Sequence, residues 1–245
     1  MEATTTVLLT AYLIVLFAFF TRALTGFGGA LLCVPLLALF FDLQFVVPVE
    51  CSLEVALSLV LVPRVLKQVD YRNLAVLVIG ALAGSLLGVR LLQSQPDASL
   101  KGALGAFIIL AGLHLLVRGR TERAQPISRA WGLLAGVIGG VLGGVFGTPG
   151  PAYVAYLAHQ APDKQVFRAT LITLFAIEYT WRLVLYVEKG LYTAVELEFS
   201  LLLVPAVVAA AFGGHFIHLR LDERVFRIVV SALLVISGAL CVLAW

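Results

Sequence analysis

The stretch GGVFGTPGP at residues 143–151 interrupts a long apolar run, and TGFGG at residues 25–29 interrupts another in the first half of the chain. A bilayer offers no water to backbone N–H and C=O groups, so irregular backbone at membrane depth must lie against protein or line a cavity. Two such breaks at matching places of a repeat are the best pointer in a sequence to the binding site of a transporter. The two stretches therefore predict where the site lies.

The composition around these breaks sets the class of protein. Of the 245 residues, 61% are hydrophobic and 13% are charged, and the mean hydropathy is +1.04. Soluble domains carry about 25% charged residues, so lipid must cover most of this chain. No polar stretch is long enough to fold alone, and residues 1–245 are predicted to form a single transmembrane domain. The first apolar run lacks a basic start and a small-residue cleavage site, which favours a retained helix over a signal peptide.

Apolar segments follow one another along the chain and predict an all-α, polytopic membrane protein. They are 7–25, 27–41, 46–63, 73–92, 100–117, 130–147, 150–159, 166–187, 199–217 and 225–244. A crossing helix needs about 20 residues, and the segment directly after each break is short for a crossing. Each break therefore forms either two crossing helices or a re-entrant hairpin, which leaves between six and ten full crossings.

The two halves resemble each other, with one copy at about 7–117 and the other at about 130–244. At an offset of 121 residues Gly26 aligns with Gly147, and at an offset of 126 residues Gly112 aligns with Gly238. The order of features agrees throughout, and this agreement carries more weight than the individual identities. The pattern predicts an internal repeat.

The basic residues predict the orientation of the repeat. Twelve of the 17 lysines and arginines lie in the connections 64–72, 118–129, 159–168 and 218–227. The positive-inside rule places these connections in the cytoplasm, so both termini lie outside and each half crosses an odd number of times. The halves then have opposite orientations, which is the inverted-repeat plan of many secondary transporters.

Arg22 lies in an apolar segment beside the first break. A charge at membrane depth costs at least about 2.5–3.5 kcal/mol, so Arg22 is expected to face protein or water. One interpretation makes it an anion ligand, assisted by backbone N–H groups freed at the break and at a helix start. The alternative is an interfacial arginine that extends toward the headgroups. The other candidate substrate-binding residues of this break are Thr25, Gly26, Gly28 and Gly29.

The second break supplies the candidate substrate-binding residues Gly147, Thr148, Pro149 and Gly150. Pro149 and Pro151 lack N–H donors and prevent a regular helix, while Thr148 adds a hydroxyl beside the freed backbone groups. We predict that both breaks line one cavity about midway through the bilayer, where their N–H donors suit an oxyanion.

Glu178 and Arg182 are four residues apart and therefore share a helix face. They form either a structural ion pair or a substrate or proton site, and Arg182 is a second candidate cation for the anion. Further coupling or gating candidates stand near the starts of this segment and of its counterpart: Arg168, Thr170, Glu50 and Ser52, with Glu54 nearby. Glu50 has the alternative of a place at the outer interface.

Other patterns predict packing rather than chemistry. Gly80, Gly84 and Gly88 recur every four residues, as do the glycines from Gly132 to Gly144, and this spacing is typical of close helix packing. The cysteines, Cys33, Cys51 and Cys241, show no metal-ligand spacing and are expected to be buried, inert thiols. No HExxH, GxSxG or P-loop pattern occurs, and His215 and His218 are expected at the interface. We expect no cofactor, no metal and no nucleic-acid partner.

The residues quoted above resemble the sulfite exporter TauE/SafE family, also called DUF81 or TSUP transporters. The similarity includes LTGFGGALLCVPLL at 24–37, GGVFGTPGPAYVAYL at 143–157 and VFRATL at 166–171, and it extends over essentially the whole chain. It implies a bacterial inner-membrane permease for small sulfur-containing or organic anions such as sulfite or sulfonates. Ala30 replaces a third glycine that many members carry, and Thr148–Pro149 replaces two small residues.

The function predicted from these features is secondary transport of a small anion by alternating access, with the two halves moving around a site built from both breaks. A proton is the candidate coupling ion. An anion channel and a membrane-embedded enzyme acting on a lipid-linked substrate are the alternatives. The enzyme would need a polar catalytic cluster, which the sequence does not contain.

Overall fold

The computed structural model describes residues 2–25, 29–117, 127–160, 163–217, 231–232 and 234–241. These residues confirm the predicted all-α fold, because they form helices and turns and contain no strand. The elements are α1 (Glu2–Thr25), α2 (Gly29–Leu37), α3 (Leu43–Leu61), η1 (Val62–Arg64), η2 (Leu66–Gln68), α4 (Tyr71–Ser94), α5 (Asp97–Val117), α6 (Ala130–Phe146), α7 (Gly150–Gln160), α8 (Lys164–Glu188) and α9 (Ala194–Ile217). Residues 231–232 and 234–241 are helical as well.

Five described helical segments are long and apolar enough to cross a membrane. They are Thr6–Ala23, Leu43–Arg64, Tyr71–Ser94, Lys164–Glu188 and Ala194–Gly213. Large apolar side chains stand on the outer surface of the bundle, and Leu59, Leu110 and Phe212 are 74%, 67% and 67% exposed. So much exposed apolar surface suits contact with lipid, and the protein is a multi-pass membrane protein.

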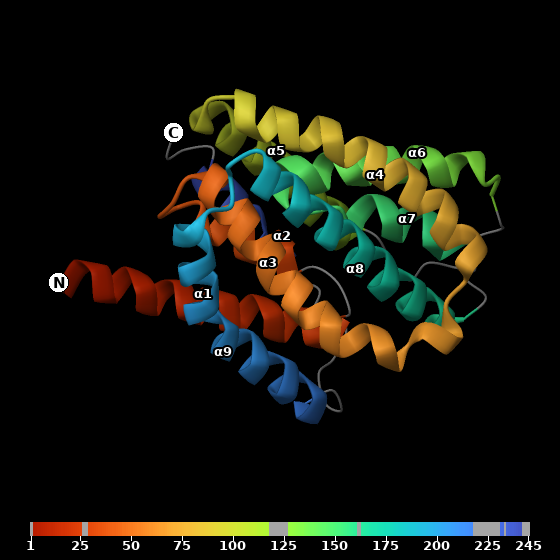
Figure 1. The fold of residues 1–245 in the computed structure, drawn as a ribbon, viewed down its shortest axis with the longest axis horizontal. Coiled ribbons are helices and arrows are strands. Elements are labelled where there is room, and N and C mark those ends of the chain that lie inside the picture. Colours follow the sequence, from red (N-terminus) through yellow and green to blue (C-terminus); the bar gives the residue numbers. More distant parts are fainter. Residues whose placement is uncertain are drawn as a thin grey trace.

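Helices α3 and α8 lie side by side in the middle of the molecule (Figure 1). On one side α1 packs along α9, and α9 also contacts α3. On the other side α4 packs against α8 and α6, and α7 packs back on α6. The central pair therefore contacts both flanking groups of helices, and any polar residue on its inner faces is shielded from lipid.

The second predicted break is a break in the structure. Helix α6 ends at Phe146, and Gly147 has a φ of 69°, a left-handed conformation that glycine adopts without strain. Helix α7 begins at Gly150, directly after Pro149. The first break falls on residues 26–28, which lie outside the described residues, between the end of α1 and the start of α2.

The helices that follow the breaks are short. Helix α2 has 9 residues and α7 has 11, whereas a crossing needs about 20. Helix α2 packs against α1, and α7 packs against α6. The apolar segment predicted at 27–41 is longer than α2, because residues 38–41 form a turn instead of continuing the helix.

The predicted glycine packing is confirmed between α4 and α6. A Cβ added to Gly80 would lie 2.9 Å from the Cα of Gly136, and one added to Gly88 would lie 2.9 Å from the Cα of Gly144. No side chain fits into such a space, so the two backbones approach each other directly. Small residues at four-residue spacing allow this contact in membranes, where dispersion and interhelical contacts replace the hydrophobic effect.

Helix α3 begins earlier than its apolar pattern predicts, at Leu43 rather than at residue 46. The backbone N–H of Leu43 donates to Asp97 Oδ1 of α5 at 2.7 Å, which satisfies one of the free donors at the helix start. A side chain far along the chain therefore extends α3. Two glutamates, Glu50 and Glu54, lie inside this helix.

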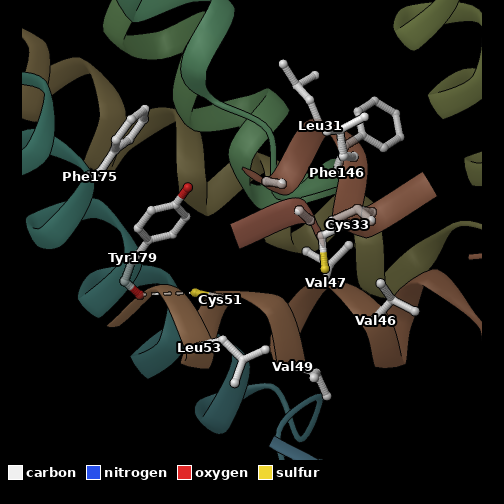
Figure 2. Packing of buried hydrophobic residues seen from close by; sticks show 14 of the residues in the cluster. Leu31, Cys33, Val46, Val47, Val49, Cys51, Leu53, Phe146, Phe175 and Tyr179 are labelled. Atoms are coloured by element: carbon white, nitrogen blue, oxygen red, sulfur yellow. Dashed lines mark hydrogen bonds between the residues drawn. The ribbon is translucent and has the colours of Figure 1, made fainter. Parts of the chain in front are cut away.

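The buried core joins α2, α3, α6 and α8 (Figure 2). Cys33 and Cys51 are among its fully buried residues, and Cys241 is buried too, so the expectation of buried thiols is confirmed. Cys51 Sγ donates to the backbone oxygen of Tyr179 at 3.2 Å and ties α3 to α8. This contact holds the two central helices in register beside the polar residues described next.

Candidate functional site

A small pocket lies where the two halves of the chain meet. It is lined by residues from α1 and α2 on either side of the first break, from the second break and from α8: Arg22, Ala30, Leu31, Thr148, Pro149, Gly150, Phe175 and Tyr179. The residues from the two breaks are far apart in sequence and belong to different helices. The pocket therefore brings together side chains that no local pattern connects.

Arg22 supplies the positive charge of this pocket. It stands in the last turn of α1 and is only 4% exposed. Its Nη1 forms an ion pair with Glu54 Oε1 of α3. Its guanidinium carbon also lies 5.6 Å from the ring centroid of Phe175 and 5.8 Å from that of Tyr179, within the range of cation–π attraction. Arg22 faces protein, and the alternative of an arginine that extends to the headgroups does not fit its burial.

Two carboxyl groups of α3 face the two breaks. Glu50 and Glu54 are one helical turn apart and both are fully buried. A Cβ added to Gly147 would lie 3.2 Å from Glu50 Oε2, and one added to Gly29 would lie 3.5 Å from Glu54 Oε1. The alternative that placed Glu50 at the outer interface does not fit, because its side chain is fully buried inside the bundle.

The two glutamates differ in their partners. Glu54 is paired with Arg22. Neither carboxyl oxygen of Glu50 accepts a hydrogen bond from any described residue, and its carboxyl lies beside that of Glu54. A buried carboxylate without a partner is very costly. The arrangement therefore calls for a proton or a bound cationic group at Glu50.

The second break contributes polar atoms without partners. Thr148 is 1% exposed, and its Oγ1 has no hydrogen-bond partner among the described residues. Helix α7 starts two residues later, at Gly150. The first N–H groups of a helix have no partner within the helix and carry the positive end of its dipole. A hydroxyl, a helix start and Arg22 thus converge on one small space, which suits an oxyanion.

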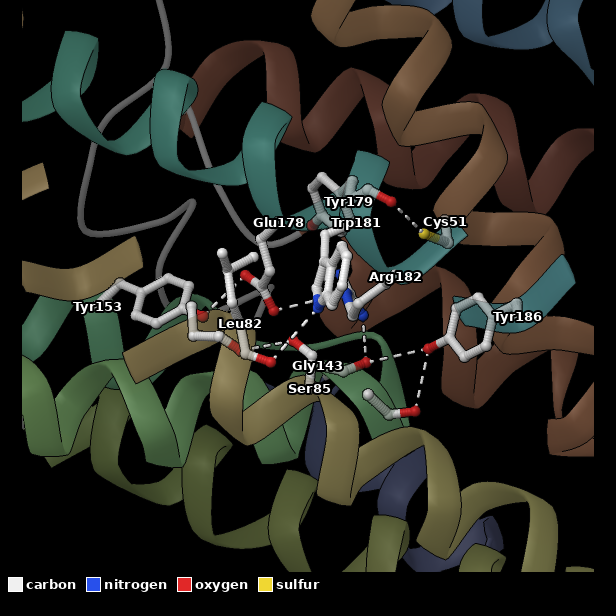
Figure 3. A network of polar contacts seen from close by, with 12 residues as sticks. Cys51, Leu82, Ser85, Gly143, Tyr153, Glu178, Tyr179, Trp181, Arg182 and Tyr186 are labelled. Atoms are coloured by element: carbon white, nitrogen blue, oxygen red, sulfur yellow. Dashed lines mark hydrogen bonds and ion pairs between the residues drawn. The ribbon is translucent and has the colours of Figure 1, made fainter. Parts of the chain in front are cut away.

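Glu178 and Arg182 form the second charged group, shown in Figure 3. Arg182 Nε lies 3.4 Å from Glu178 Oε1, and both side chains are buried. Tyr153 of α7 donates its hydroxyl to Glu178 Oε2 at 2.8 Å. Arg182 Nη1 donates to the backbone oxygen of Gly143 near the end of α6. The pair therefore connects α8 to both helices around the second break.

Tyr179 stands between the two charged groups. Its ring centroid is 4.6 Å from the guanidinium carbon of Arg182 and 5.8 Å from that of Arg22. It also lines the pocket, whereas Glu178 and Arg182 are not among the lining residues. The tyrosine thus links the pocket to the Glu178–Arg182 pair, which lies behind it.

The other predicted residues lie apart from the pocket. Ser52 donates to Ser200 Oγ at 2.8 Å and connects α3 to α9. Thr170 Oγ1 accepts from the backbone N–H of Asp70 at 3.0 Å and fixes the start of α4. Arg168 is exposed near the start of α8. The geometry gives Ser52 and Thr170 contacts between helices and gives Arg168 no place at the pocket.

Several predicted positions have no described side chain. Gly26, Gly28 and His218 lie outside the described residues, and Thr25 and His215 are described only as helical positions. Gly29 and Gly147 are buried at the two breaks. Among the described residues, no group of three or more histidine, cysteine, aspartate or glutamate side chains is placed to hold a metal ion.

Sequence reasoning did not connect Glu54, Phe175 and Tyr179 to the site. The four-residue spacing of Glu50 and Glu54 within an apolar run was the available signal, because it puts both carboxyls on one helix face. Phe175 and Tyr179 have the same spacing on α8, and their rings lie 5.6 Å apart. Aromatic residues are common on buried helix faces, so nothing in the sequence singled these two out.

Known proteins resemble this chain in sequence over most of its length. The family model described as sulfite exporter TauE/SafE matches residues 11–240. A protein of Cupriavidus necator named "Probable sulfite/organosulfonate exporter TauE" is 27% identical over 155 residues, which cover 62% of this chain and 60% of that relative. The match thus spans less than two thirds of the relative's length. No solved structure matches the chain.

Proposed function

Because the chain belongs to the sulfite exporter TauE/SafE family, we propose that it is a secondary transporter of small sulfur-containing or organic anions. Sulfite and sulfonates are the proposed substrates, since the similar protein of Cupriavidus necator is named for sulfite and organosulfonates. The proposed location is the inner membrane of a bacterium.

One observation carries the proposal of an anion site: Arg22 and Thr148, from opposite halves of the chain, line the same pocket. A sulfite or sulfonate group has oxygens that can accept from the guanidinium, from the Thr148 hydroxyl and from the N–H groups in the first turn of α7, where Pro151 offers none. Hydrogen bonds to charged groups contribute about 1.5–3 kcal/mol. Phe175 and Tyr179 also line the pocket, and their large side chains favour a small substrate.

The proposed transport mechanism is alternating access. Helices α1 and α2, like α6 and α7, are taken as pairs whose breaks meet at the pocket. The two opposed halves of an inverted repeat can expose one central site to either side of the membrane in turn. The direction of transport then follows from the gradients of the anion and of any coupled ion.

Flux into proteoliposomes tests the function. The purified protein is reconstituted, and uptake of labelled sulfite and of labelled sulfonates is measured against the anion concentration. Saturable uptake supports a transporter, whereas single-channel currents would indicate an anion channel instead.

Substitutions test the site in the same assay. Arg22→Gln should reduce the apparent affinity about 10- to 100-fold, from the loss of a charged hydrogen bond. Thr148→Val, which keeps the shape, should cost about 2- to 10-fold. Arg90→Gln on the exposed face of α4 is the matched control and should transport normally. Normal affinity in a folded Arg22→Gln protein would rule out the assigned anion site.

A further inference from the structure

The ionisable side chains buried around the pocket would not have zero net charge if all of them were ionised. They comprise two guanidinium groups and three carboxyl groups: Arg22, Arg182, Glu50, Glu54 and Glu178. Fully ionised, this group would hold one net negative charge away from water, and an unpaired charge there is very costly. One proton makes the group neutral. Glu54 and Glu178 are each paired with an arginine, whereas Glu50 has no ion-pair partner among the described residues, so Glu50 is the carboxyl that calls for the proton.

Arg22 also has two roles. It is the cation that lines the pocket, and it is the ion-pair partner of Glu54. An anion that binds Arg22 in the pocket approaches the position held by the Glu54 carboxylate. Two negative groups at one guanidinium repel each other strongly in a buried site.

We propose that Glu54 and the transported anion compete for Arg22, and that Glu54 takes up one proton when the anion binds. This inference rests on the proposed function and deepens it by naming the proton-binding residue. The charges balance in both states. Without the anion, Arg22 and Arg182 offset Glu54 and Glu178 while Glu50 holds a proton. With a monoanion bound, the anion replaces Glu54 as the partner of Arg22, and protonated Glu54 is neutral.

The groups around Glu54 are consistent with this exchange. The ionisable side chains that act on it or lie near it are Arg22 from α1, Cys33 from α2, Glu50 and Cys51 from α3, and Glu178, Tyr179 and Arg182 from α8. Arg182 is already paired with Glu178 and donates to Gly143. Among these described groups, Arg22 is thus the cation that pairs with Glu54, and losing it to an anion favours the neutral acid.

The exchange has a consequence for transport. An anion and a proton that bind together also move together, so each monoanion crosses with one proton and no net charge. Flux should then respond to the pH gradient and be insensitive to the membrane voltage.

Proton uptake on binding is the decisive measurement. Methanesulfonate is the probe, because it stays a monoanion at all pH values used and cannot take the proton itself. Titration of the full-length protein in weakly buffered detergent solution, followed with a pH indicator, should show about one proton taken up per anion bound. The dissociation constant should rise about tenfold per pH unit over the range in which Glu54 is ionised in the free protein.

Two matched variants test which residue takes up the proton. Glu54→Gln should still bind methanesulfonate, with higher affinity because the competitor is gone, and should lose both the proton uptake and the pH dependence. Glu50→Gln, one turn away on the same helix, should keep the uptake of one proton. Uptake that persists in Glu54→Gln, or that disappears only in Glu50→Gln, would overturn the assignment.

Further measurements distinguish a folding defect from a failure of this inference or of the proposed function. If Glu54→Gln does not fold, the neutral double variant Arg22→Gln with Glu54→Gln removes the lone charge, and it should neither bind the anion nor take up a proton. If the wild-type protein binds methanesulfonate or sulfite without any proton uptake, the proposed function stands and this inference fails. If it binds neither anion, both fail.

Discussion

Single residues decide the backbone geometry at the second break. Gly147 and Gly190 both have a φ of 69° and end helices α6 and α8. Their surroundings differ. A Cβ on Gly147 would lie 3.2 Å from Glu50 Oε2 and 3.3 Å from Val34 Cγ2, whereas one on Gly190 would meet nothing within 4 Å. The same conformation therefore serves a crowded polar site in one place and an open turn in the other.

Gly147→Ala and Gly190→Ala form a matched pair of variants. Each should lose about 1–2 kcal/mol, since a side chain is strained in the left-handed region. Only Gly147→Ala should also lower anion flux, because its methyl group meets the buried carboxyl of Glu50. Thermal unfolding in detergent and flux in proteoliposomes measure the two effects. Equal flux in the two variants would show that the contact between position 147 and Glu50 has no part in transport.

The ion pair of Glu178 and Arg182 gives a second prediction at this scale. Arg182→Gln leaves Glu178 as an unpaired buried charge, and breaking a buried pair in this way costs about 3–5 kcal/mol. The double variant Glu178→Gln with Arg182→Gln should recover most of this stability. Retained flux in the stable double variant would identify the pair as structural, whereas lost flux would assign it a part in transport.

At the scale of helices, the packing of α4 against α6 depends on close contacts that the glycine spacing in the sequence indicates. Helices α4 and α6 touch through glycines, and a Cβ on Gly84 would lie 3.0 Å from the Cα and carbonyl carbon of Val137. These are backbone atoms of Val137, and they cannot move aside as the end of a flexible side chain could. Helix α6 leads into the second break, so the position of the pocket depends on this close approach.

Gly84→Ala should therefore destabilise the protein by about 1–3 kcal/mol, the usual cost of overpacking. Gly102→Ala is the control within a helix, because a Cβ there would meet nothing within 4 Å. It should be neutral or stabilising by about 0.5–1 kcal/mol, as alanine favours helix more than glycine does. Unfolding temperatures of both variants in one detergent give the comparison, and a Gly84→Ala protein as stable as Gly102→Ala would disprove direct backbone packing.

The orientation of the whole molecule in the membrane remains a prediction from its basic residues. Both ends of an odd number of crossings must lie on opposite sides, which places position 4 outside and position 128 in the cytoplasm. The cysteines of the wild-type protein, Cys33, Cys51 and Cys241, are all buried, so background labelling should be low. Thr4→Cys and Ser128→Cys should react with an impermeant maleimide from opposite sides of the membrane. Labelling of both from the same side would exclude the inverted repeat.

The sequence by itself determined the class of protein, the helices and the second break. A mean hydropathy of +1.04 leaves lipid as the only suitable solvent, and long apolar runs in lipid must be helices because their backbone needs internal partners. Gly147 and Pro149 interrupt the helix through their own covalent geometry, whereas Pro151 stands in the first turn of α7, where its missing N–H costs no hydrogen bond. The pairing of Glu178 with Arg182 also follows from local spacing, since residues four apart share a helix face.

Only the tertiary structure decided which charges meet between helices. Glu54 stands on α3 and Arg22 on α1, and the rotation and depth of one helix against another depend on packing over their whole lengths. The early start of α3 shows the same dependence, because Asp97 of α5 satisfies the N–H of Leu43. Local propensity and apolar spacing act over a few residues, whereas the pocket is built from side chains of α1, α2, α7 and α8 together with the second break. The physical reason is that a contact between distant segments depends on the packing of the whole chain.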